Sequence, residues 1–205
     1  MTSLKQFVSK QIESAAYHEA AHITAAVVQA MPLRATGVHV DLYGHGCADY
    51  FDRAVGDLAL TELDEVERQR TVIALFAAHA AQLKFNPNCD RDGWIHDLSK
   101  IRKLMLEMYP TGNQAAEDEL EARAKRLVDD HWGIIEDLAK TLLSRPLVPL
   151  SAKDTVWGIG PYKRNMSGAE LVEFFARHNK TPKIVNDDVK NYDSTQDVPP
   201  YDSLA

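Results

Sequence analysis

The chain has 205 residues, 45% hydrophobic and 26% charged, a composition that suits one compact domain or a domain with an appendage. With a formal net charge of −7 and no local cluster of Lys or Arg, it lacks the basic surface that holds a nucleic-acid phosphate backbone. The sequence also lacks a signal-peptide pattern and any apolar run of about 18 residues, while Cys47 and Cys89 fit neither a disulfide framework nor a Cys-x-x-Cys metal site. We therefore expect a cytoplasmic protein with free thiols and with neither a membrane nor a nucleic-acid partner.

The N-terminal part of the chain predicts a helix followed by a pair of strands. Apolar residues recur at helical spacing over about Leu4–Ala30, and Pro32 follows the end of that helix. Apolar and polar residues then alternate over 38–42, and after the turn sequence "YGHG" a second short strand is predicted near Ala48–Phe51. We expect a small strand pair and not a large sheet.

Helices dominate the rest of the chain. Helical periodicity predicts helices over Leu63–Phe85, Ile95–Tyr109 and Ala115–Ser144, and the second half of the first of these is almost entirely apolar and should be buried. Ser167 and Glu170 have the spacing of a capping box and predict one more short helix. The sequence as a whole predicts a mainly α fold with a small strand pair or sheet, of the α+β class.

The pattern divides the chain into three regions. Residues 1–145 are predicted to form one domain, and 146–180 an irregular segment with a C-terminal helix packed on that domain. Residues 181–205 are polar with little apolar periodicity. Because so little apolar surface cannot offset the entropy lost on ordering, we expect this tail to be loosely held.

The stretch "YHEAAH" at residues 17–22 carries the clearest chemical signal. His18 and His22 are four residues apart on a predicted helix, so both imidazoles can point at one zinc ion beside the helix axis. Glu19 lies beside the same point, where it could take a proton from a zinc-bound water as general base and later deliver it to a leaving amine. This H-E-x-x-H pattern in an alanine-rich helix therefore predicts a zinc site that hydrolyses peptide bonds.

A catalytic zinc site needs a third protein ligand. The metzincin form of the motif requires Gly and His after His22, and the sequence there is "ITAAVV". A distant donor is therefore required. The candidates are acids and histidines that border apolar helices: His79, Asp90, Asp92, His96 and Asp97.

Several segments resemble, in order, the peptidase domain of FtsH-type ATP-dependent zinc proteases. They are "AAYHEAAHITAAVV", the strand pair after it, "ALFAAHAAQLKFNP" and "DGWIHDLSKIRKLMLEM". In that family a T-G-x-x-N-D-L segment supplies the aspartate that completes the zinc site; Gly93 falls on its glycine, His96 on its asparagine and Asp97 on its aspartate. The resemblance covers roughly residues 10–145 and implies a zincin-like helical metallopeptidase domain in which Asp97 is the third zinc ligand.

Three positions depart from the family pattern around this site. Ala21 stands where the family usually has glycine, His79 where it has arginine, and Gln82 where it has an acidic residue. We expect Gln82 and His96 to support the zinc ligands by hydrogen bonding. We expect His79 to be a core histidine whose nitrogens have partners.

The resemblance also shapes the expected activity. FtsH-type proteases carry a membrane anchor and an ATPase module ahead of the peptidase domain, and this sequence shows neither, nor a phosphate-binding loop. We therefore expect a zinc-dependent metalloendopeptidase that cleaves flexible or unfolded polypeptides, as a homo-oligomer or with a separate unfoldase partner. The substrate is expected to pair with an edge strand that contains Gly37, Val38, His39 and Val40.

Two other functions fit parts of the sequence. The first alternative is a noncatalytic, zinc-stabilised module that binds or regulates another protein, although a purely structural zinc site gains nothing from Glu19. The second alternative is a metal-free helical domain in which the histidines are fortuitous. Metal analysis of the purified protein separates the last of these from the first two.

Overall fold

The computed structural model describes residues 4–50, 65–89, 94–149 and 162–185. In these residues the helices are α1 (Leu4–Val28), α2 (Glu65–Phe85), α3 (Ile95–Met108), α4 (Gln114–Asp130), α5 (Trp132–Ser144) and α6 (Gly168–Ala176). The strands are β1 (Leu33–Asp41), β2 (Gly46–Tyr50), β3 (Val148–Pro149), β4 (Tyr162–Met166) and β5 (Ile184–Val185). The mainly helical α+β fold predicted from the sequence is confirmed. None of these helices is both long enough and apolar enough to cross a membrane.

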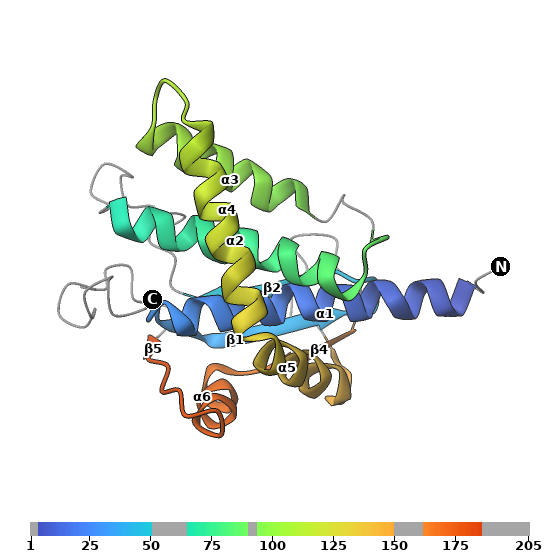
Figure 1. The fold of residues 1–205 in the computed structure, drawn as a ribbon. Coiled ribbons are helices and arrows are strands. Elements are labelled where there is room, and N and C mark those ends of the chain that lie inside the picture. The colour runs from blue at the N-terminus through green and yellow to red at the C-terminus, as the bar shows by residue number, and fades with distance from the viewer. Residues whose placement is uncertain (1–3, 51–64, 90–93, 150–161, 186–205) are drawn as a thin grey trace.

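Helix α1 passes through the middle of the molecule, with α2 alongside it (Figure 1). Both helices carry a series of buried alanines: Ala15, Ala16, Ala20, Ala21, Ala25 and Ala26 on α1, and Ala74, Ala77, Ala78 and Ala81 on α2. Small side chains let two helices pack with their axes close together. Polar side chains on one helix can then reach backbone and side-chain atoms of the other.

The predicted single helix over Ala115–Ser144 is wrong, because the chain forms two helices, α4 and α5, that meet at His131. His131 has φ −115° and ψ 17°, and Gly133, two residues later, has low helix propensity. Helix α4 packs on α2, whereas α5 packs on α1, where Trp132 stacks on Tyr17 with 5.5 Å between ring centroids. The break lets two halves of one apolar pattern bury themselves against different helices.

Strand β1 lies in the interior of the sheet, whose order is β2-β1-β4-β3, with β5 also paired with β1. Val38, His39 and Val40 each have one partner residue in β2 and another in β4. Gly37, with φ 76°, lies against the connection from β4 to α6, where a Cβ would be 2.7 Å from the carbonyl carbon of Ser167. The prediction of an edge strand here is therefore wrong, since β1 is paired on both sides, and the predicted strand pair belongs to a small sheet.

Three of the strands come from regions expected to be irregular or loosely held. In the 146–180 region, β4 pairs antiparallel with β1 and β3 pairs antiparallel with β4. In the 181–205 region, β5 pairs parallel with the start of β1, and residues 186–205 lie outside the described residues. Parts of both regions therefore form strands, because pairing with a distant strand orders a segment that has no apolar periodicity of its own.

Helix α6 begins at the predicted capping box, which is confirmed. The Glu170 carboxylate accepts a hydrogen bond from the backbone N–H of Ser167 at 2.8 Å, and the Ser167 hydroxyl accepts one from the backbone N–H of Glu170 at 3.4 Å. Leu171, Phe174 and Phe175 are buried, and the helix lies on β1. The C-terminal helix and the strand after α1 therefore share one core.

Candidate metal centre

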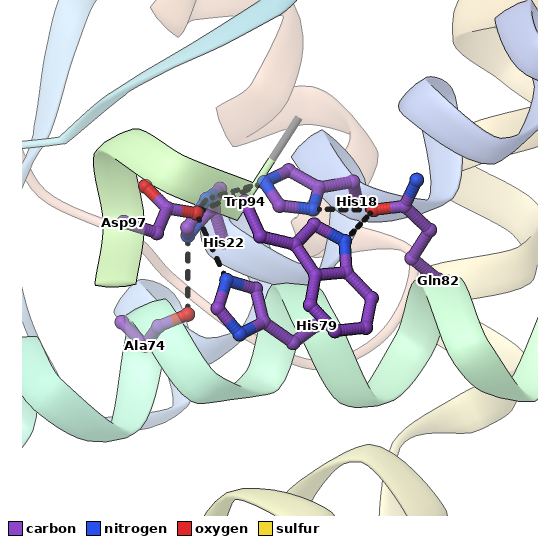
Figure 2. Close-up of polar contacts among 7 residues, drawn as sticks. All are labelled: His18, His22, Ala74, His79, Gln82, Trp94 and Asp97. Carbon is purple, nitrogen blue, oxygen red and sulfur yellow. Dashed lines mark hydrogen bonds and ion pairs between the residues drawn. The ribbon is translucent and has the colours of Figure 1, made fainter. Parts of the chain in front are cut away.

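His18 and His22 lie one turn apart on the buried face of α1, and their Nε2 atoms are 3.1 Å apart. Asp97 comes from the first turn of α3. Its Oδ2 atom is 3.1 Å from Nε2 of His18 and 3.2 Å from Nε2 of His22 (Figure 2). The fold thus brings the two motif histidines to an aspartate that follows His22 by 75 residues.

The hydrogen bonds of Gln82 determine where the proton of His18 resides. Trp94 Nε1–H, which can only donate, donates to Gln82 Oε1 at 2.7 Å and so identifies that atom as the amide oxygen. The same oxygen lies 3.0 Å from Nδ1 of His18 and can only accept, so Nδ1 of His18 is the protonated nitrogen. The Nε2 lone pair of His18 is then directed at the cluster. Gln82 therefore holds His18 by this hydrogen bond.

His22 is oriented in the same way by a backbone atom. Its Nδ1 lies 3.1 Å from the carbonyl oxygen of Ala74 on α2, and a carbonyl oxygen only accepts. His22 therefore carries its proton on Nδ1 and presents Nε2 to the cluster. Metal-binding histidines are held by this kind of contact, which sets both the tautomer and the ring orientation.

The three atoms that face one another are therefore all acceptors: two imidazole Nε2 atoms and one carboxylate oxygen. Their separations are 3.1, 3.1 and 3.2 Å. Ligand atoms about 2.0–2.1 Å from a tetrahedral ion lie about 3.3 Å from each other, so the triad nearly matches one face of such a tetrahedron. His18, His22 and Asp97 could hold a metal ion and leave its fourth position open.

The charge of Asp97 is set by its surroundings. Burial opposes its ionisation, but the imidazoles of His22, His18 and His79 outweigh burial and hold the pKa of the carboxyl well below its usual range. The carboxylate also lies in the first turn of α3, where the helix dipole favours negative charge. Asp97 is therefore an anion at neutral pH, the form in which it could bind a metal ion.

Glu19 is buried next to the triad, with 6% of its surface exposed. Burial raises the pKa of Glu19 to about 7, against the opposing effect of His18 and with a further increase from Asp97. Gly46 of β2 makes room for the carboxyl group, because a Cβ at position 46 would lie 2.6 Å from Glu19 Oε1. A cation in the triad would favour the carboxylate form, so Glu19 is placed to act as a base near neutral pH.

His79 enters the cluster from α2. Its Nε2 is 3.6 Å from Asp97 Oδ2 and has no hydrogen-bond partner among the described residues, although the side chain is buried. Burial lowers the pKa of His79, against the opposing effect of Asp97. The imidazole stacks on Trp94 with 4.7 Å between centroids and 11° between planes. The expectation that both nitrogens of His79 have partners is therefore wrong for Nε2.

The other residues expected near the site lie elsewhere. His96 is exposed on α3 and does not belong to the cluster, although Asp97 follows it directly. Asp90, Asp92 and Gly93 lie outside the described residues. His39 lies within β1, at a position paired on both sides.

Two contributors to the site were not predicted from the sequence, and each acts through a contact between distant segments. Trp94 fixes the orientation of the Gln82 amide and stacks on His79. Gly46 gives Glu19 its space, and only its position in the turn-rich "YGHG" stretch singles it out in the sequence. The identity of Trp94 or of Gly46 does not by itself predict such a contact from the sequence.

Comparisons with protein-family models, with curated protein sequences and with solved structures gave no match. The resemblance to FtsH-type peptidases therefore stays a prediction from the sequence. What the geometry establishes is a buried group of two histidines and one aspartate that could hold a metal ion.

Proposed function

We propose that the protein is a zinc-dependent metalloendopeptidase that hydrolyses peptide bonds in flexible or unfolded polypeptides. The observation that carries the proposal is the arrangement of three acceptor atoms, 3.1 to 3.2 Å apart, with the buried Glu19 carboxyl group next to them. Three convergent acceptors repel one another unless a cation, either a metal ion or a proton, lies between them. The Glu19 carboxylate is not one of the three proposed metal ligands, so it is available for proton transfer.

Each residue has a distinct part in the proposed reaction. His18, His22 and Asp97 hold the ion, which when bound polarises the substrate carbonyl and lowers the pKa of a water molecule to about 7. Glu19 takes the proton of the attacking water and delivers it to the leaving amine. Gly46 keeps the Glu19 carboxyl in place by offering no side chain that would displace it.

The proposal of zinc depends on Glu19 as well as on the ligands. Two histidines and one carboxylate also bind Fe(II) in oxygenases, so the ligand set alone does not select the metal. An acid–base group beside the open position serves hydrolysis, which is the chemistry of zinc sites of this ligand type. Metal analysis of protein purified without added metal tests this choice, and we expect about one zinc per chain.

Strand β2 is the proposed place for the substrate main chain. It holds Gly46 against Glu19, and in the described part of the sheet it pairs only with β1. An extended peptide could add to its other side by backbone hydrogen bonds, which bind without regard to side-chain identity. This binding mode suits unfolded segments of varied sequence.

Cleavage of casein by the zinc-loaded protein tests the proposal. Glu19→Gln should lower the rate about 10²- to 10⁴-fold, the usual contribution of a general base, while zinc content stays the same. Gly46→Ala is a matched variant that leaves every proposed ligand and Glu19 in the sequence. Its methyl group should displace the flexible Glu19 carboxyl, so we expect a large loss of cleavage with zinc retained.

The result that contradicts the enzyme is equal cleavage by wild type and Glu19→Gln that persists after chelation. If both proteins contain stoichiometric zinc, that result would favour the noncatalytic, zinc-stabilised module over the enzyme. Absence of any bound metal from the wild type would contradict both zinc hypotheses.

A further inference from the structure

His79 is a buried imidazole that lies beside Asp97, one of the proposed metal ligands. Only 6% of its surface is exposed, and its Nε2 has no hydrogen-bond partner within the described residues. That nitrogen is 3.6 Å from Asp97 Oδ2, slightly longer than a hydrogen bond. A buried imidazole nitrogen this close to a carboxylate is either a metal ligand, through its lone pair, or a hydrogen-bond donor to the carboxylate when it carries the proton.

The geometry argues against a fourth ligand. A fourth corner of a tetrahedron would be about 3.3 Å from each of the other three donor atoms. His79 lies outside the group of residues whose ligand atoms are all within 4.8 Å of one another, and that group consists of His18, His22 and Asp97. It therefore lies next to Asp97 but outside the group of three possible ligands.

The orientation of the His79 ring is fixed by the residue that also controls His18. Trp94 stacks on the imidazole of His79 in nearly parallel planes, 11° apart. The same Trp94 donates its Nε1–H to Gln82 Oε1, the acceptor that holds His18 Nδ1. One indole thus sets both a ligand histidine and the imidazole beside the ligand aspartate (Figure 2).

We propose that His79 is a positioning residue whose Nε2–H donates to the Asp97 carboxylate and holds it at the proposed metal. This inference rests on the metal site of the proposed function but not on peptide hydrolysis. The donated hydrogen bond fixes which way the carboxylate faces, and the Trp94 stack fixes the donor. Groups that orient metal ligands in this way typically contribute 10- to 100-fold to metal affinity.

Zinc affinity, measured by competition with a chromogenic chelator, tests the role of His79. His79→Phe keeps an aromatic ring against Trp94 but removes the N–H, and we expect zinc to bind about 10- to 100-fold more weakly. His79→Gln keeps an N–H at a similar reach and should recover most of the affinity. His79→Leu also removes the donor and is close to histidine in volume, so it replaces His79→Phe if the Phe ring disturbs packing. Circular dichroism checks that each variant is folded.

The absorption spectrum of the Co(II)-loaded protein adds a readout that a merely structural role would not change. We expect four-coordinate cobalt in wild type and His79→Gln, with band positions shifted in His79→Phe and His79→Leu because the aspartate is no longer held. Equal zinc affinity in wild type and in the folded variants without the donor would overturn the inference. So would an affinity loss that His79→Gln does not recover, accompanied by a change in coordination number, because that result makes His79 a ligand. Failure of the wild type to bind zinc at all would instead overturn the proposed function.

Discussion

Buried polar groups lie at three levels along the contact of α1 with α2, and hydrogen bonds join a donor to an acceptor at each of the outer two, although the buried hydroxyl of Thr24 has no hydrogen-bond partner among the described residues. At one end, Asn86 Nδ2 donates to the hydroxyl of Ser14 at 3.1 Å. At the other end, Gln29 Nε2 donates to the carbonyl oxygens of Ala25 and Arg70 at 3.2 and 3.1 Å. These contacts satisfy polar groups that the helix interface would otherwise bury without partners.

The middle level is built differently. Here three acceptor atoms converge within 3.2 Å, and the nearby Nε2 of His79 has no hydrogen-bond partner in the described structure. A metal ion or a proton between these atoms would remove their mutual repulsion. The same two helices therefore carry polar residues that complete the fold and a group that could hold a metal ion.

The sharpest way to break this comparison is to remove the anionic ligand. Asp97→Asn keeps the shape of the side chain but removes its charge, and we expect zinc affinity to fall more than about 100-fold, beyond the usual effect of a supporting contact. Asn86→Ala at the outer level is the matched control and should leave zinc affinity unchanged. Competition with a chelator measures the zinc affinity of both variants. Similar losses of affinity in the two would mean that the middle level does not bind the metal.

Removal of the metal should lower the free energy of unfolding only because the middle level loses its ion. At free zinc of about 100 times the dissociation constant, binding adds about 2.7 kcal/mol to the free energy of unfolding, and chelation should remove this amount. Urea unfolding with and without chelator measures the difference. Asp97→Asn should show almost no such difference, and an equal chelator effect in that variant would place the metal elsewhere.

Gln82 tests whether the middle level depends on the tautomer of His18. Gln82→Leu removes the acceptor for His18 Nδ1, and we expect zinc to bind about 10- to 100-fold more weakly. Gln82→Glu keeps an acceptor oxygen at this position and should bind zinc at least as tightly as wild type. Chelator competition again gives the affinities, and an unchanged value in Gln82→Leu would show that the acceptor is dispensable.

The smallest expected effect is at the Gln29 level. Gln29→Met keeps the length of the side chain but loses the donor to the Arg70 carbonyl, and we expect the free energy of unfolding to fall by about 1 kcal/mol. Zinc affinity should not change. A variant with normal stability but weakened zinc binding would contradict the assignment of this level to structure.

Sequence periodicity predicted most of the helices because their apolar residues are close in sequence and recur with the helical period. It did not predict the break at His131, which depends on α4 and α5 packing on different partners. The sheet was predicted least well. The pairing of β1 with β4 and β5 joins segments more than 100 residues apart, and short strands carry little local signal.

By itself, the sequence determined that His18, Glu19 and His22 share one part of a helix, because four-residue spacing on a helix leaves little choice. Only the tertiary structure decided which donor hydrogen-bonds to Gln82, which carbonyl orients His22, and that β1 is closed to substrate on both sides. Asp97 depended on both sequence and tertiary structure. A family resemblance pointed to this residue, and the packing of α3 on α2 brings it to the histidines. The physical reason is range: backbone periodicity acts over a few residues, whereas tautomers, ligand distances and strand neighbours are set by atoms that meet only when the chain has folded.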